Sequence, residues 1–175
     1  MHLQLTPSAK DHQVAALAAL AIGIHVLESV LPSPLPGVKP GFANIITLIA
    51  YACYGFEIAA WVSVLRVLVG SLIVGTFLSP TFVLSFSGAV ASMLVLWLLT
   101  EVKLFKLSLF GIAILMAMAH MFAQLIMVYW LFIPHEAIFK LLPILLTASL
   151  VFGLLNGVIA SKVYEKLSPN VDTRD

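Results

Sequence analysis

The sequence predicts an all-α integral membrane protein, and three features of its composition carry this prediction. Hydrophobic residues make up 62% of the 175 residues, and the mean hydropathy is +1.11. Only 10% of the residues are charged, whereas a soluble domain carries about 25%, so this chain cannot cover a surface that faces water. The apolar residues form long runs, and the length allows about six transmembrane helices of roughly 20 residues each. We therefore expect one membrane domain over residues 1–175, with no room for a soluble catalytic domain.

Prolines, glycines and polar residues divide this domain into six apolar segments. The first ends at Pro32, the third before Pro80 and the fifth at Pro134, because proline lacks an amide donor and ends helices. The first segment follows Lys10 without a signal-peptidase site, so we expect a retained helix. The second is too short to span roughly 30 Å of hydrocarbon and must be shielded by neighbours or lie beside a cavity. The expected helices lie at about 13–31, 42–54, 57–78, 82–100, 108–133 and 137–163, followed by a polar tail at 164–175.

The distribution of basic residues predicts the orientation of the bundle. With the N-terminus inside, two basic residues, Lys39 and Lys140, face outward, and Arg66 lies within the membrane. The other six basic residues lie on the inner side, and this excess of inner positive charge favours cytoplasmic termini. A proline-rich segment at 32–44 would then face outward, as a lid. The inner basic residues are Lys10, Lys103, Lys106, Lys162, Lys166 and Arg174.

Charge and cysteine content exclude several classes of function. The net charge of +1 gives no basic face for nucleic acid. The single cysteine, Cys53, excludes an internal disulfide and a metal site built from several cysteines. We expect no cofactor.

Arg66 lies near the middle of the third apolar segment, where a charged side chain costs about 2.5–3.5 kcal/mol on insertion scales. It must face the bundle interior and find a partner. Glu28, in the first segment, is the one acidic residue well placed within another apolar segment, but it lies roughly 10 Å nearer the outer surface. Arg66 and Glu28 therefore either form a buried pair that fixes helix register, or Arg66 anchors an anionic ligand.

Two further polar pairs share helix faces. His25 and Glu28 are three residues apart on the first segment, and His120 and Gln124 are four apart on the fifth. These side chains either hydrogen-bond between helices or line a ligand cavity. A metal site is the weaker alternative, because nothing fixes the spacing between the helices.

The start of the second segment offers an anion site. Asn44 is either a helix N-cap or a ligand contact. Lys39, together with the free amides of this helix start, is a candidate for binding an anion, and a solvated loop lysine is the alternative. Asn156, deep in the sixth segment, is interpreted as a hydrogen bond between helices.

A stripe of small residues on the first segment predicts a docking surface. Ala15, Ala19 and Gly23 recur every four residues, and such stripes let another helix approach closely in lipid. The stripe lies on the inner half of the segment, where a partner on the cytoplasmic side could reach it.

Two motifs resemble those of the Gx transporter family, which is often labelled heptaprenyl diphosphate synthase component I. They are LPGVKPGFAN at residues 35–44 and SVLRVLVGS at 63–71, followed by Gly75-Thr76. Ala119-His120 and Gln124 are also similar to the family pattern, and the resemblance covers about residues 14–163.

The resemblance implies a six-helix fold like that of the S components of energy-coupling-factor transporters. Those proteins bind small molecules near the outer surface of the bacterial cytoplasmic membrane, with a transmembrane coupling protein and two cytoplasmic ATPases. Ala15 and Ala19 match their docking motif.

The synthase label does not predict an enzyme that works alone. The three aspartates, Asp11, Asp172 and Asp175, are not clustered, so they cannot hold magnesium against a diphosphate. A Walker A motif is absent too, which leaves ATP hydrolysis to a partner. We therefore expect a non-enzymatic subunit that binds or transports a small, partly anionic molecule. The alternative is an accessory membrane protein, without transport, in isoprenoid, quinone or flavin-linked redox metabolism.

Overall fold

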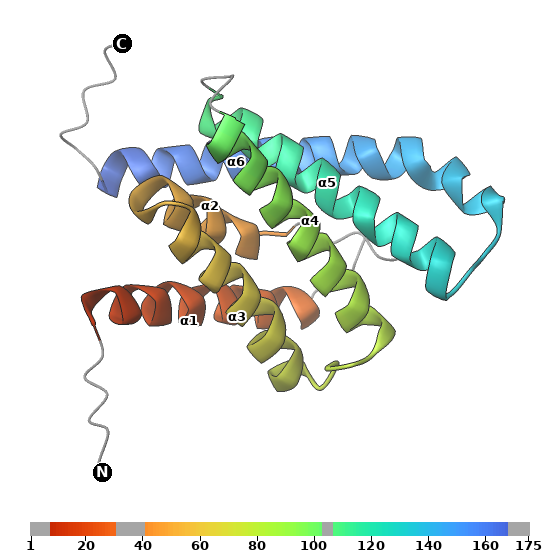
Figure 1. Ribbon diagram of the computed structural model, residues 1–175, viewed down its shortest axis with the longest axis horizontal. Helices are drawn as coiled ribbons and strands as arrows, with labels where there is room; N and C mark the ends of the chain where they lie inside the picture. The colour runs from red at the N-terminus through yellow and green to blue at the C-terminus, as the bar shows by residue number, and fades with distance from the viewer. Residues whose placement is uncertain (1–7, 31–40, 103–106, 168–175) are drawn as a thin grey trace.

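The computed structural model describes residues 8–30, 41–102 and 107–167, and within these ranges the chain is a bundle of helices without a β-strand (Figure 1). Five helical stretches are long and apolar enough to cross a membrane, and the second helix is shorter. The predicted all-α membrane bundle with a short second helix is thus confirmed. In order, the elements are α1 (Ala9–Val30), α2 (Ala43–Tyr54), α3 (Phe56–Val74), α4 (Pro80–Val102), α5 (Leu109–Leu131), the 3-10 helix η1 (Glu136–Leu141) and α6 (Leu142–Leu167).

Local chemistry moves several helix ends away from their expected positions. Helix α3 ends at Val74 because Gly75 adopts the left-handed conformation (φ 76°) and its N–H donates to the Leu72 carbonyl. The sixth segment is divided, because Pro143 lacks an amide donor and is tolerated only in the first turn of α6, with η1 before it. Helix α6 runs to Leu167, so the first residues of the expected tail are helical.

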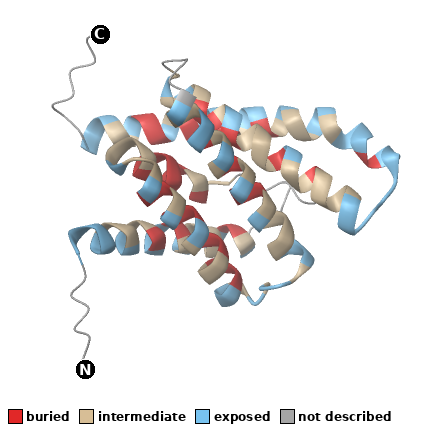
Figure 2. Ribbon diagram, viewed as in Figure 1, coloured by how far each residue is buried: buried red, intermediate tan, exposed pale blue. Residues whose placement is uncertain are grey.

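The short helix α2 lies at the centre of the bundle. The long helices form a row in which α1 packs on α3, α3 on α4, α4 on α5 and α5 on α6, and α2 packs against α1, α3 and α6. Ala43 and all residues from Ile45 to Ala50 are buried, and Figure 2 shows the pale outer faces of the long helices. Its neighbours thus shield the helix that is too short to cross the membrane.

The length of α2 leaves space inside the bundle. At 1.5 Å per residue its 12 residues cover about 18 Å, whereas the 22 residues of α1 cover about 33 Å. Helix α2 runs antiparallel to α1, back toward the first residues of α1. The space therefore remains at the N-terminal end of α2. The start of α1 and the end of α6 lie at the same end of the bundle, which we call the terminal end (Figure 1).

Two glycines bring α5 and α6 into close contact. A Cβ atom added at Gly157 would lie 2.9 Å from the Phe110 Cα, and one at Gly153 would lie 3.0 Å from the Ile114 Cα. Spaced four residues apart, these glycines let the two backbones approach, which is a common basis of helix packing in lipid. The α5–α6 seam is therefore closed by backbone contact.

Candidate functional site

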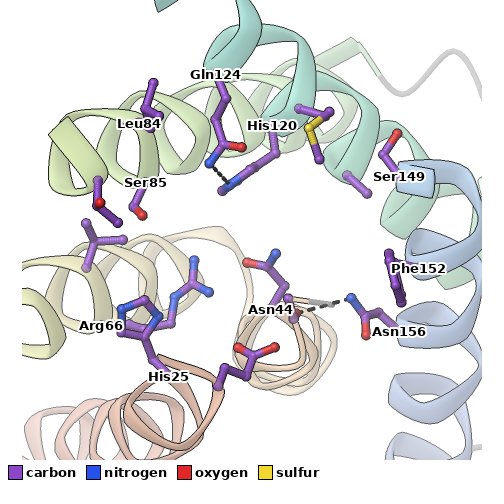
Figure 3. Close-up of a pocket in the computed structure, with 16 residues that line it drawn as sticks. His25, Asn44, Arg66, Leu84, Ser85, His120, Gln124, Ser149, Phe152 and Asn156 are labelled. Atoms are coloured by element: carbon purple, nitrogen blue, oxygen red, sulfur yellow. Dashed lines mark hydrogen bonds between the residues drawn. The ribbon is translucent and has the colours of Figure 1, made fainter. Parts of the chain in front are cut away.

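A cavity of about 470 Å³ lies at the N-terminal end of α2, and residues from all six helices line it (Figure 3). Six of the seven predicted ligand-binding residues lie around it, namely His25, Glu28, Asn44, Arg66, His120 and Gln124. The seventh, Lys39, and most of the proline-rich segment expected to form a lid lie outside the described residues. Helix α4 also lines the cavity, with Thr81, Leu84 and Ser85, although no residue of this segment was predicted to belong to the site; Ser149 and Phe152 of α6 were likewise not predicted.

Arg66 reaches the cavity from the middle of α3 and is only 4% exposed. Its guanidinium points into the space between α1, α2 and α5 (Figure 3). Within the described part of the chain it makes no ion pair within 4.0 Å and no hydrogen bond, and its Nε is buried without a partner. The predicted direct pair with Glu28 is therefore not formed, and the charge of Arg66 faces the cavity.

Glu28 instead holds the beginning of α2. Its carboxylate accepts hydrogen bonds from the N–H of Phe42 at 2.6 Å and from that of Ala43 at 3.4 Å. The first amides of a helix lack partners within the helix and carry a partial positive charge, which a carboxylate stabilises. Glu28 is 5% exposed, so this contact is made away from water. The acidic residue of α1 thus fixes the position of α2 at the edge of the cavity.

Asn44 does not cap α2, contrary to one of its two predicted roles. Phe42 is the N-cap residue, and its apolar side chain offers no acceptor, so Glu28 supplies the cap from another helix. The Asn44 side chain instead faces the cavity (Figure 3). The Asn156 side chain donates to the Gly41 carbonyl at 3.2 Å, so this hydrogen bond joins α6 to the chain just before α2 and not to another helix.

The wall opposite Arg66 is polar but uncharged. The side chains of His120 and Gln124 are joined at 3.1 Å (Figure 3). The Nδ1 of His120 lies 3.4 Å from the Ser92 hydroxyl. The Ser92 hydroxyl lies 3.0 Å from the backbone carbonyls of both Gly88 and Met116, which share its single proton. This network holds the imidazole in one orientation, so His120 and Gln124 present fixed polar groups to the cavity.

Each cavity histidine fits against a glycine of the neighbouring helix. A Cβ atom at Gly70 of α3 would lie 2.6 Å from the Cδ2 of His25, and one at Gly88 of α4 would lie 2.5 Å from the Nε2 of His120. Any larger residue would displace these rings. The two glycines are thus part of the site; Gly70 lies in the SVLRVLVGS motif at 63–71, whereas Gly88 lies in no motif noted in the sequence.

The site combines one cation, Arg66, and one carboxylate, Glu28, with further hydrogen-bonding groups. Arg66 supplies a positive charge, and the imidazole and amide groups of α1, α2 and α5 supply donors and acceptors. Among the described residues no group of three or more His, Cys, Asp or Glu side chains is arranged to hold a metal ion. The arrangement suits an organic anion that also makes neutral hydrogen bonds.

The predicted docking stripe lies away from the cavity. Ala15, Ala19 and Gly23 are all exposed on α1, and a Cβ atom added at Gly23 would meet no heavy atom within 4 Å. The opposite face of α1 packs on α2 and α3, with Ala18 and Ala21 buried. The stripe is therefore open to lipid or to another protein.

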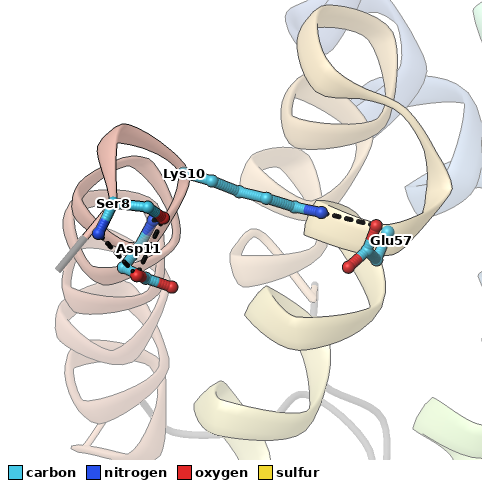
Figure 4. A network of polar contacts seen from close by, with 4 residues as sticks. All are labelled: Ser8, Lys10, Asp11 and Glu57. Carbon is cyan, nitrogen blue, oxygen red and sulfur yellow. Dashed lines mark hydrogen bonds and ion pairs between the residues drawn. The ribbon is translucent and has the colours of Figure 1, made fainter. Parts of the chain in front are cut away.

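The polar contacts at the terminal end form a separate network (Figure 4). The Ser8 hydroxyl and amide both donate to Asp11 at 2.8 Å, and this capping arrangement starts α1 at Ala9, earlier than expected. Lys10 pairs with Glu57 of α3 at 2.5 Å, but the two side chains are 47% and 69% exposed. Such an exposed pair contributes at most about 1 kcal/mol to stability.

A protein-family model described as heptaprenyl diphosphate synthase component I matches residues 17–163. This range covers most of the chain and contains every residue that lines the cavity. No curated protein and no solved structure matches the chain.

We predict that replacing Glu28 destabilises the bundle. In Glu28→Ala the α2 amides lose a charged acceptor, so the free energy of unfolding should fall by about 1.5–3 kcal/mol. Glu28→Gln keeps one acceptor and should lose less. Thermal unfolding of the purified protein in lipid nanodiscs measures both. Glu57→Ala, which removes an exposed carboxylate, is the control and should change little; a Glu28→Ala protein as stable as that control would contradict the capping role.

Proposed function

We propose that this chain, which belongs to the heptaprenyl diphosphate synthase component I family, binds a small, partly anionic molecule inside the membrane as one subunit of a larger assembly. The observation that carries the proposal is the buried Arg66 guanidinium, which faces the cavity and, in the described ranges, has no carboxylate within 4.0 Å. Charged residues within membrane segments are costly and are mostly retained for function. An anionic ligand would supply the missing partner.

The size and chemistry of the cavity support a small ligand. Pockets for small molecules have volumes of roughly 300–1,000 Å³, and this cavity of about 470 Å³ lies in that range. Asn44, His120 and Gln124 would orient the ligand through hydrogen bonds, while Arg66 would hold its negative charge. The ligand would thus be recognised by one charged contact and several neutral ones.

We propose further that the subunit works as an S component of a transporter, in a bacterial cytoplasmic membrane. The exposed stripe of Ala15, Ala19 and Gly23 supports this role, because a coupling protein could pack closely against it. ATP hydrolysis would then belong to partner ATPases.

An accessory role without transport is the second candidate. The family description names one component of a synthase, which favours association with other components of prenyl diphosphate metabolism. Purification from the native membrane separates the two: a coupling protein and ATPases would support transport, and a synthase or redox subunit would support the accessory role.

We predict that Arg66→Ala loses the ligand but keeps the fold. Hydrogen bonds to charged groups contribute roughly 1.5–3 kcal/mol. The anion retained by the purified protein, measured by mass spectrometry, should therefore fall by about tenfold or more. Lys140→Ala, which removes an exposed cation that does not line the cavity, should retain the ligand. If Arg66→Ala keeps the ligand and loses about 3–5 kcal/mol of stability, as expected when a buried ion pair is broken, the proposal is wrong.

We predict that large side chains on the stripe prevent assembly with a partner but leave folding and ligand binding intact. The double variant Ala15→Trp, Ala19→Trp should fold and keep its ligand, because both positions are exposed, yet fail to copurify with the coupling protein. Gly157→Trp is the matched control and should not fold, since even a Cβ atom there meets backbone. Unfolding of the double variant by itself would show that the stripe packs internally and would remove the docking proposal.

We predict that the terminal end of the bundle, which holds the start of α1 and the end of α6, faces the cytoplasm. In a Cys53→Ser background, a cysteine at the exposed Glu136, between α5 and α6, should react with an impermeant reagent added to intact cells. A cysteine at Glu165, near the end of α6, should be protected until the membrane is opened. The reverse labelling pattern would invert the proposed orientation.

A further inference from the structure

We infer that the ligand carries a hydrogen-bond donor, an N–H or O–H group, in addition to its anionic group, and that Ser92 is a positioning residue for this contact. The inference rests on the proposed ligand-binding function and adds a second chemical feature of the ligand. It follows from the order of the protons in the network that joins Ser92, His120 and Gln124.

The Ser92 hydroxyl is the fixed end of this network. Ser92 is buried and does not line the cavity, so it acts from behind the wall that His120 forms. The carbonyls of Gly88 and Met116, both at 3.0 Å, share its one proton, which leaves none for His120. The hydroxyl oxygen keeps a lone pair that can accept. The Nδ1 of His120, at 3.4 Å, therefore faces an acceptor and must carry the imidazole proton.

The contact on the other side of the ring gives the same assignment. The amide nitrogen of Gln124 lies 3.1 Å from the Nε2 of His120 (Figure 3). An amide nitrogen only donates, so Nε2 must be the unprotonated nitrogen that accepts. The imidazole is therefore neutral, because a proton on Nε2 would set two donors against each other. Both ring nitrogens are used within the network, and His120 acts on a ligand by ordering Gln124.

The opposite order of protons would change what the cavity offers. With the proton on Nε2, Gln124 would have to turn its amide and accept through its oxygen, which would leave only N–H groups for a ligand. Ser92 would then have to withdraw its proton from both carbonyls to serve Nδ1. In the order found here, the Gln124 oxygen accepts no hydrogen bond from the described residues and is not enclosed by packing. This oxygen is therefore open to the cavity that Gln124 lines.

An open carbonyl oxygen selects a ligand that donates. A ligand that covers this oxygen with an apolar group removes its water and leaves it without a hydrogen bond, which weakens binding by about tenfold or more. Sites built to hydrogen-bond a substrate N–H or O–H reject analogues that lack the group for this reason. Because Arg66 lines the same cavity, the ligand joins an oxyanion to a donor, as a carboxylate that also bears a carboxamide does.

Nitrogen NMR of protein with labelled histidines, in lipid nanodiscs, tests the proton order without a ligand. The His120 signals are identified by their loss in His120→Asn. We expect the proton on Nδ1 in the wild type and a mixture of both forms in Ser92→Ala, where the acceptor is lost. Ser87→Ala is the matched control and should keep the wild-type signals, because Ser87 lies on the same helix, bonds the Leu84 carbonyl and does not line the cavity. A wild-type proton on Nε2, or unchanged signals in Ser92→Ala, would overturn the inference.

Two probes of the same shape test the donor, namely 4-carbamoylbenzoate and 4-acetylbenzoate, in which a methyl group replaces the amide NH2. Calorimetry in nanodiscs measures their affinities. The wild type should bind 4-carbamoylbenzoate about tenfold or more tightly than 4-acetylbenzoate, as expected for one buried hydrogen bond. The preference should disappear in Gln124→Leu and shrink in Ser92→Ala, whereas Ser87→Ala should keep it.

The outcomes separate this inference from the proposed function. Equal affinity for the two probes, with both dependent on Arg66, would overturn the inference and leave the proposed function standing. Binding of neither probe would overturn the inference as well. Binding of both probes that persists unchanged in Arg66→Ala would contradict the proposed function itself.

Discussion

The contact between the Glu28 carboxylate and the first amides of α2 is the interaction on which the rest of this structure depends. Helix α2 is too short to cross the membrane, so its N-terminal amides lie within the bundle, where they need acceptors. Glu28 supplies both bonds from α1, at 2.6 and 3.4 Å. Where α2 begins sets where the cavity lies, and Asn44 and Gly41 line the cavity from that start.

The same contact explains why Arg66 is left to face the cavity. Glu28 accepts two backbone hydrogen bonds at the start of α2, which stabilise its carboxylate without direct contact with Arg66, although its negative charge still acts on the guanidinium. Arg66 then keeps its charge in a buried space, and that charge favours whatever anion enters. A ligand that binds only the folded state stabilises it, by about 2.7 kcal/mol when the ligand concentration is 100 times the dissociation constant. Ligand occupancy and the stability of this protein should therefore be coupled.

Small residues serve two different purposes in this bundle. Gly153 and Gly157 let α6 meet α5, and Gly70 and Gly88 make room for the rings of the two cavity histidines. The stripe on α1 has the same spacing of small side chains, yet it meets nothing within the chain. In lipid, close packing of small residues drives helix association. An unused surface of this kind is therefore available to another membrane protein.

The sequence by itself determined the membrane location, the all-α class, the short second helix and most of the polar residues that surround the cavity. These follow from composition, from proline positions and from the cost of placing polar groups in hydrocarbon, all of which are properties of single segments. The partner of Glu28, the role of Asn44, the contribution of α4 and the glycines behind the two histidines were decided only by the tertiary structure. In a membrane bundle the lipid-facing and inward faces of a helix are both apolar, so hydrophobic periodicity does not reveal how each helix is rotated. Depth and rotation decide which side chains meet, and packing between helices far apart in the sequence sets both.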